Sequence, residues 1–89
     1  MKSISKFIWF DGKLVPKDKA LIPVTTHAIH YGTSIFEGIR AYWNSENLFI
    51  FRLNEHTNRL FESAHILGLT IPFTKEELNE AQVQVFLRN

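Results

Sequence analysis

The 89-residue sequence contains no cysteine, no long apolar run and no stretch dominated by one sign of charge. Without cysteine the chain has neither disulfides nor thiolate metal sites, which fits a reducing cytoplasm. No segment approaches the roughly 20 apolar residues needed to cross a bilayer, and the first ten residues lack the pattern of a cleavable leader. We therefore expect a soluble cytoplasmic domain that makes no use of a membrane.

The formal net charge is +1, because ten basic residues are interspersed with nine acidic ones. This distribution lacks the basic stripe that attracts nucleic acid, so nucleic acid is not an expected partner. Apolar residues make up 45% of the chain and aromatic residues 13%, which is enough for a globular core. One domain of this size buries only about 60–65% of its unfolded surface, so we expect marginal stability without a partner.

Turn signals divide the first part of the chain into strands. Asp-Gly is a favoured hairpin turn, proline ends a strand because it has no N–H group, and a polar quartet marks a hairpin loop. These signals predict strands at 6–10, 13–15, 30–43 and 48–52, with turns at 11–12 and 44–47 and with Pro16 ending the second strand. For residues 17–23 the sequence predicts a connector but no particular secondary structure. Residues 24–30 accommodate one helical turn.

Two amphipathic helices are expected after the strands. Asn54 is the expected N-cap of the first helix and Gly68 its C-terminal stop, and a capping box at 74–77 opens the second helix. The expected inner faces are Thr57, Leu60, Phe61, Ala64 and Leu67 in one helix and Leu78, Ala81, Gln82, Val85 and Phe86 in the other. Strands followed by helices predict an α+β fold, an antiparallel sheet with two helices on one face.

The stretch 30–43, HYGTSIFEGIRAYW, carries the residues of greatest functional interest. Strand-like alternation places on one face an aromatic ring, a glycine, a guanidinium group and a second aromatic ring. After Ser34, these are Phe36, Gly38, Arg40 and Tyr42. Glycine weakens a strand unless a backbone or a ligand approaches closely. The pattern predicts a half-buried wall that lines a small, anionic and partly apolar ligand.

Three arginines, Arg40, Arg52 and Arg59, come from the central strand, its neighbour and the following helix. Guanidinium groups bind carboxylate or phosphate in bidentate fashion. The alternative, which composition alone favours, is three surface arginines paired with acids such as Glu55 or Glu62. Both interpretations stay open from the pattern itself.

The histidines do not have the spacing of a zinc-binding helix, so ordinary hydrogen-bonded histidines are expected rather than metal ligands. They are His27, His30, His56 and His65. No G-x-S-x-G motif supports a nucleophilic serine, which argues against hydrolase chemistry. Gly32 and Gly38 also lack the strand-to-helix arrangement of a nucleotide-binding loop.

Three runs resemble a single known family: IWFDGKLVP at 8–16, HYGTSIFEGIRAY at 30–42 and FRLNEHTNRL at 51–60. They are similar to the N-terminal region of branched-chain amino acid aminotransferases, class IV enzymes of fold type IV that use pyridoxal 5'-phosphate. The resemblance covers nearly the whole chain. D-amino acid aminotransferase and aminodeoxychorismate lyase share part of the pattern, but SIFEGIRAY at 34–42 resembles the branched-chain enzymes most closely.

The resemblance implies an enzyme that moves an amino group between leucine, isoleucine or valine and 2-oxoglutarate. It implies that Arg59 binds the cofactor phosphate and that Phe36, Gly38 and Arg40 lie along the substrate pocket. Tyr31 is expected near a dimer interface, where it reaches the neighbouring subunit's site. The family resemblance thus implies a homo-oligomer, either a dimer or an assembly of dimers.

The chain departs from the family in its lysines. Transamination needs a lysine that forms a Schiff base with the cofactor, and in the family this lysine belongs to a larger C-terminal domain. The lysines present here lie at other places: Lys2, Lys6, Lys13, Lys17, Lys19 and Lys75. We therefore expect residues 1–89 to be the small N-terminal domain, incomplete at its C-terminal end and inactive alone. Two alternatives stay open: a free-standing module that binds a small anion through its arginines, and a dimerisation domain without catalysis.

Overall fold

The first hairpin forms where the Asp-Gly turn predicts it, in a computed structural model that describes residues 6–89. β1 (Phe7–Phe10) pairs antiparallel with β2 (Lys13–Pro16). Asp11 and Gly12 have φ angles of 52° and 97°, the left-handed values that a tight hairpin turn requires. The predicted hairpin is confirmed, with Pro16 as the last paired residue. Lys2, assigned to the N-terminal tail, lies outside the described residues.

A short helix forms in the region predicted for a helical turn, but it also includes His30 and Tyr31, which were predicted to begin the central strand. η1 (Lys17–Lys19), a 3-10 helix, follows β2, and α1 (His27–Tyr31) comes after an irregular connector. α1 ends at Gly32, whose φ of 68° is a left-handed conformation that glycine adopts without strain.

The second hairpin is shorter than the predicted strands. β3 (Ala41–Trp43) pairs antiparallel with β4 (Leu48–Ile50). Asn44 closes the loop, because its side-chain oxygen accepts hydrogen bonds from the backbone N–H groups of Glu46 and Asn47 at 2.9 and 2.7 Å. The α+β class and the antiparallel pairing are confirmed, but the described strands form two separate two-stranded sheets instead of one.

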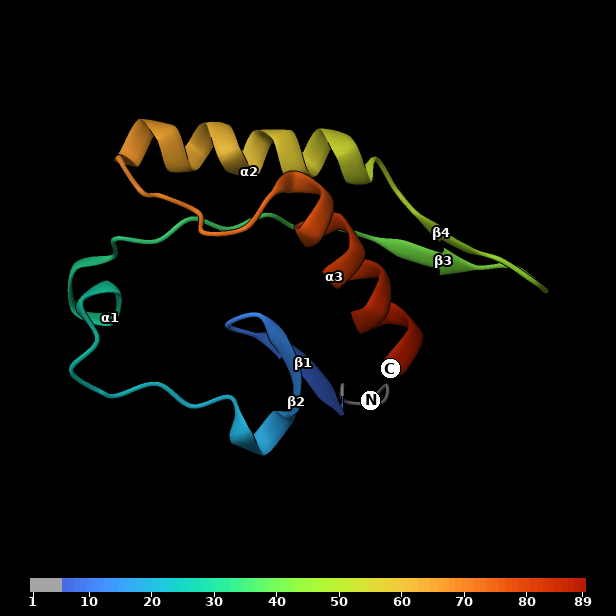
Figure 1. Ribbon diagram of the computed structural model, residues 1–89, viewed down its shortest axis with the longest axis horizontal. Helices are drawn as coiled ribbons and strands as arrows, with labels where there is room; N and C mark the ends of the chain where they lie inside the picture. The colour runs from blue at the N-terminus through green and yellow to red at the C-terminus, as the bar shows by residue number, and fades with distance from the viewer. Residues whose placement is uncertain (1–5) are drawn as a thin grey trace.

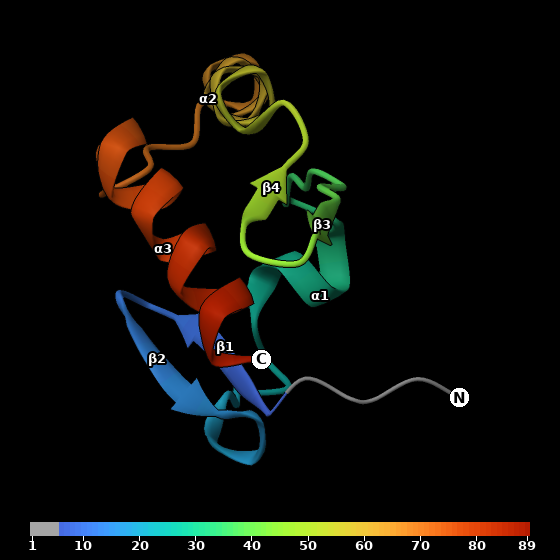
Figure 2. The same cartoon turned by 90° about the vertical axis from the view of Figure 1, so that its right-hand side faces the viewer.

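Two long helices, α2 (Leu53–Leu67) and α3 (Lys75–Arg88), pack against each other, and α3 lies over β1 of the first hairpin. The β3–β4 hairpin extends past the N-terminal end of α2 (Figures 1 and 2). Trp9 of β1 meets Phe73 edge-on, with ring centroids 5.0 Å apart. The hydroxyl of buried Thr57 in α2 donates to Asn79 in α3. Among the described residues, no helix has both the length and the apolar character needed to cross a membrane.

The helix ends test the predicted caps. Thr74 and Glu77 form the expected capping box at the start of α3, and Gly68 ends α2 with a φ of 72°. The prediction of Asn54 as N-cap is wrong: α2 already begins at Leu53, after Arg52 in a left-handed conformation. The Asn54 side chain instead accepts a hydrogen bond from the Asn79 amide at 2.9 Å.

Candidate functional site

Residues 33–40 form an extended segment that connects α1 to β3 below α2 (Figure 1). Its burial alternates along the chain: Ile35, Glu37 and Ile39 are half-buried, whereas Phe36 and Arg40 are exposed. Among the described residues no strand pairs with 33–39, so this part of the predicted strand has no ladder. The Arg40 carbonyl accepts one hydrogen bond, from the Phe51 N–H group at 2.8 Å, next to the β3–β4 pair. The predicted division into two faces is nevertheless confirmed by the burial.

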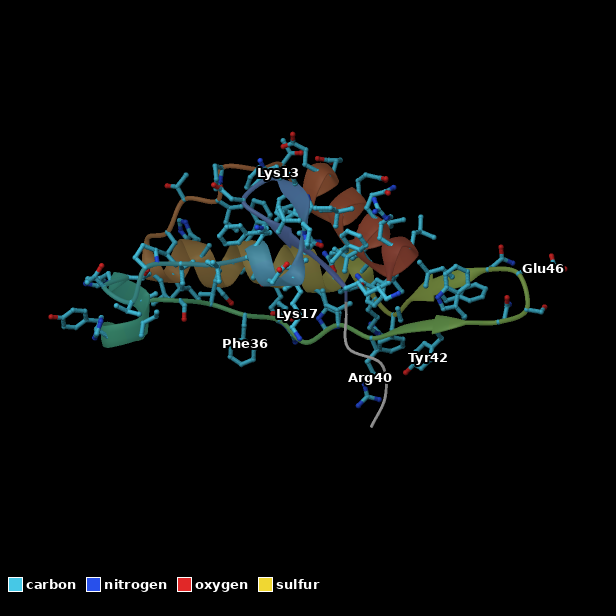
Figure 3. The ribbon with its side chains drawn as sticks, turned by 90° about the horizontal axis from the view of Figure 1, so that it is seen from below. Lys13, Lys17, Phe36, Arg40, Tyr42 and Glu46 are labelled. Carbon is cyan, nitrogen blue, oxygen red and sulfur yellow. The ribbon has the colours of Figure 1, made fainter. Side chains whose placement is uncertain are left out.

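The side chains of the predicted wall lie on the exposed face, but they are not half-buried as predicted, since Phe36 is 89% and Tyr42 54% exposed. Figure 3 shows that Phe36, Arg40 and Tyr42 point to the same side, away from the two long helices. A hollow of about 300 Å³ lies on this side, lined by Gly38, Arg40, Tyr42, Phe51 and His56. The space beside the Gly38 α-carbon is open, with no atom beyond the adjacent residues within 4 Å of where a β-carbon would stand. A small ligand can therefore approach the backbone at Gly38 between a guanidinium group and aromatic rings.

The five predicted site residues do not all converge. Gly38 and Arg40 share the hollow, and Phe36 points to the same side but is 89% exposed and outside the lining. Tyr31 belongs to α1, at the far end of the extended segment (Figure 1). It is 74% exposed and stacks on the His27 ring at 4.5 Å. Arg59 lies elsewhere, against the inner face of the segment.

The inner face holds an ion pair that the sequence analysis did not identify. Arg59 donates from Nε to Glu37 Oε2 at 2.8 Å and from Nη2 to Glu37 Oε1 at 2.7 Å. His56 Nδ1 lies 2.8 Å from the same Glu37 Oε1 and donates to it, because an ionised carboxylate only accepts. His56 is shared by both sides, since it also lines the hollow.

Charge pairing favours the ionised forms of both groups. Hydrogen bonds from Arg59 and, second, from His56 lower the pKa of the Glu37 carboxyl from 4.5 to about 2. The hydrogen bond with Glu37 in turn raises the pKa of the Arg59 guanidinium above its usual value. At neutral pH the pair is therefore a carboxylate and a guanidinium cation.

The three arginines stay apart in the structure. The Arg52 guanidinium lies 5.5 Å from the centre of the Phe51 ring, and Arg40 lines the hollow. Arg59 has an acidic partner, as the surface interpretation required, but this partner is Glu37 and not Glu55 or Glu62. A signal for Glu37 existed: the alternation places this acid between Ile35 and Ile39 on the inward face, where a carboxylate needs a charged partner.

The histidines behave as predicted where hydrogen bonds are described. His27 Nδ1 bonds with the Thr33 hydroxyl at 2.7 Å, and His30 Nε2 donates to the Val24 carbonyl at 2.7 Å. His56 binds Glu37. These contacts confirm the expectation of hydrogen-bonded side chains for three of the four histidines.

The family resemblance implies a phosphorylated cofactor, with Arg59 as the residue expected at its phosphate. Arg59 fits its phosphate end: the side chain is 63% exposed, and its Nη1 group has no partner within residues 6–89. The hollow beside Gly38 and Arg40 has no lysine to bind the cofactor covalently, since none of its lining residues in the described part of the chain is a lysine. Lys75 lies elsewhere, 5.4 Å from the centre of the Phe61 ring. Within residues 6–89, Arg59 therefore offers free N–H groups to an anion, and no lysine lines the hollow.

A family model for amino-transferase class IV matches residues 34–89. The branched-chain-amino-acid aminotransferase of Pseudomonas aeruginosa is 51% identical over 74 residues, which are 83% of this chain and 24% of that protein. The Escherichia coli K12 enzyme of the same name is 42% identical over 83 residues, which are 93% of this chain and 27% of that protein.

Solved structures of branched-chain amino acid aminotransferases also match this chain. The crystal structure of the T.th. branched-chain amino acid aminotransferase with pyridoxamine 5'-phosphate matches with a TM-score of 0.93 at 48% identity. The match covers 99% of this chain and 29% of that chain. Across the relatives described here, this chain spans less than a third of their length.

Proposed function

This chain belongs to the class IV aminotransferase family, and we propose that it is the small N-terminal domain of a branched-chain amino acid aminotransferase. The parent enzyme moves an amino group between leucine, isoleucine or valine and 2-oxoglutarate, and a larger domain outside residues 1–89 carries the cofactor lysine. One observation carries the proposal: a chain 51% identical to such an enzyme presents Phe36, Gly38 and Arg40 on one exposed face.

Ligands of the T.th. enzyme support the two substrate classes. Its structures include complexes with N-(5'-phosphopyridoxyl)-L-glutamate and with 4-methylvaleric acid. The first joins the cofactor to an acidic amino acid, and the second has the branched carbon skeleton of leucine. A pocket for both needs an apolar wall and a cation in reach. Phe36 supplies an apolar surface and Arg40 supplies the cation, with Gly38 leaving room between them.

The proposed cofactor is pyridoxal 5'-phosphate, with Arg59 as one ligand of its phosphate. The cofactor supplies the electron sink and carries the amino group when it is bound. Arg59 contributes fixed N–H donors and a positive charge to a dianion, which is the chemistry that phosphate recognition needs. The pairing with Glu37 leaves the Nη1 edge of the guanidinium available for this role.

Tyr31 is proposed as a contact between subunits of a homo-oligomer. It is 74% exposed at the end of α1, and nearby Ile29 and Val24 are 56% and 81% exposed. Exposed apolar side chains that gather in one region favour burial against another surface. We propose that a second subunit covers this region and that Tyr31 reaches that subunit's pocket. We also propose a cytoplasmic location for the parent enzyme, and the absence of cysteine from residues 1–89 agrees with it.

Residues 1–89 are proposed to be inactive alone, since none of their lysines matches the cofactor lysine of the family. The test is to sequence the reading frame that contains this chain, express its whole product and assay leucine with 2-oxoglutarate. We expect the frame to continue into a lysine-bearing domain and the product to transaminate leucine. A natural stop codon after Asn89, together with phosphate binding by the finished chain, would establish the anion-binding module instead.

A further inference from the structure

The Arg59 side chain is oriented by a partner that uses one of its two binding edges. A guanidinium group has a side-on edge, Nε with Nη2, and an end-on edge, Nη1 with Nη2. Both carboxylate oxygens of Glu37 occupy the side-on edge at 2.8 and 2.7 Å. The end-on edge has no partner at Nη1 within residues 6–89, and the Arg59 side chain is 63% exposed. The pairing therefore fixes the plane of the guanidinium and leaves the second edge available to an anion.

Glu37 is itself held in place. Its side chain is only 9% exposed, and its Oε1 also accepts a hydrogen bond from His56, whose side chain is 16% exposed. His56 and Arg59 lie three residues apart on α2, so both side chains meet the extended segment on the same helix face. Three hydrogen bonds from one helix thus fix this carboxylate. A long arginine side chain that is fixed in advance loses less conformational entropy when it binds a ligand.

We propose that Glu37 and His56 are positioning residues that present the end-on edge of Arg59 to the phosphate group of the cofactor. The proposal rests on the proposed function of this domain, because that function supplies the phosphate. Glu37 is also an anion, so its charge opposes the approach of phosphate. Orientation and repulsion therefore predict opposite effects for the removal of its charge.

Glu62 provides the matched control. Its charge acts on Arg59, but none of the hydrogen bonds of the described residues joins the two side chains. Glu62→Gln removes one negative charge near Arg59 without releasing its guanidinium, whereas Glu37→Gln removes a charge and the bidentate acceptor together. The two variants thus separate the orientation of Arg59 from the electrostatic effect of a neighbouring acid.

The test uses the 89-residue chain labelled with nitrogen-15, titrated with inorganic phosphate at a mildly alkaline pH, with the Nε–H signal of Arg59 as the readout. In the original chain we expect a rigid Arg59 Nε–H group and a phosphate-dependent shift. Glu37→Gln should weaken phosphate binding by about three- to tenfold and mobilise the guanidinium. Glu62→Gln should leave the affinity unchanged or slightly higher, and His56→Ala should give a smaller loss than Glu37→Gln.

Distinct results contradict distinct parts of the account. Equal or tighter phosphate binding by Glu37→Gln, with Glu62→Gln behaving in the same way, would overturn the positioning role alone. A rigid Arg59 that does not respond to phosphate would overturn the proposed phosphate site and the positioning role with it. The dispersion of backbone amide signals shows whether each variant is folded. If Glu37→Gln unfolds, His56→Ala decides: unchanged affinity and rigidity in that variant contradict the proposal.

Discussion

The two regions that were predicted to form strands, 7–16 from its turn signal and 33–43 from its alternation, reach different structures. In the first, each strand residue faces a partner across the Asp-Gly turn, and α3 covers the hairpin. In the second, pairing is restricted to β3, and the preceding residues are extended without a ladder. The first region is stabilised by contacts within the described chain. The second has an inner face that packs and an outer face that is exposed.

The difference shows what an alternating pattern encodes. Alternation determines which side chains share a face, because successive side chains of an extended chain point to opposite sides. A ladder additionally needs a partner strand, and a two-residue turn supplies one only for the first region. In the proposed function, the exposed outer face is the part that other segments of the parent enzyme and its substrate cover. We therefore expect substitutions in the first hairpin and the two long helices to lower the free energy of unfolding. Substitutions on the exposed outer face should leave it nearly unchanged until a ligand is present.

The largest expected contrast compares the same new residue in the helix that covers the first region and on the exposed face of the second. Ala81 is 7% exposed on α3, whereas Phe36 is 89% exposed. Ala81→Asp introduces a carboxylate without a partner, so it should lower the free energy of unfolding by about 3 kcal/mol or more. Phe36→Asp should change it by no more than about 0.5 kcal/mol. Urea titration followed by circular dichroism measures both, and equal losses would contradict the contrast.

The next effect concerns the contact between the two long helices. Thr57 is 2% exposed, and its hydroxyl donates to Asn79. Thr57→Val keeps the shape but removes the donor, so we expect a loss of about 1–2 kcal/mol and a fall in Tm of roughly 4–16 °C. Thr57→Ser keeps the hydroxyl and should lose less. A Tm equal to that of the original chain for Thr57→Val would show that this bond does not stabilise the scaffold.

The helix caps give a smaller effect, of about 1 kcal/mol. Thr74→Ala removes the side-chain acceptor of the α3 capping box and should cost about 0.5–2 kcal/mol. Asn54→Ala removes only the acceptor of the Asn79 amide, so it should cost less, measured by the same urea titration. A larger loss for Asn54→Ala than for Thr74→Ala would contradict this ranking.

The smallest effect is the pH dependence contributed by Glu37. Because its pKa falls from 4.5 to about 2 on folding, the carboxylate stabilises the folded chain fully above about pH 4.5. This stabilisation is lost as the pH falls towards 2. The difference in unfolding free energy between the original chain and Glu37→Gln should therefore shrink between these two values. Salt should reduce it, because Arg59 is largely exposed. A difference that does not change with pH would contradict the ion pair.

Local signals predicted most of the secondary structure. The turn at 11–12, the stop at Gly68 and the box at 74–77 each depend on neighbouring residues, and each is confirmed. The division into two sheets was not predicted, because alternation does not reveal which strands pair. Asn54 was misassigned since the left-handed turn at Arg52 starts α2 early.

The candidate site was also predicted only in part. The exposed face with Phe36 and Arg40 followed from alternation alone. The ion pair of Glu37 with Arg59 did not, because it joins residues 22 positions apart and no local rule specifies such a contact. Roles for Arg59 and Tyr31 came only from the family resemblance, and they stay proposals.

The most direct test of the central claim is a chimera in which residues 1–89 replace the matching segment of the T.th. enzyme. The measurement is kcat/KM for leucine with 2-oxoglutarate, together with the Kd for pyridoxal 5'-phosphate. The account predicts a chimera that transaminates leucine, and an Arg59→Ala variant that binds the cofactor about tenfold more weakly or worse, since a hydrogen bond to a charged group contributes about 1.5–3 kcal/mol. A folded chimera that binds the cofactor equally well without Arg59, or that leaves leucine unreacted, would contradict it.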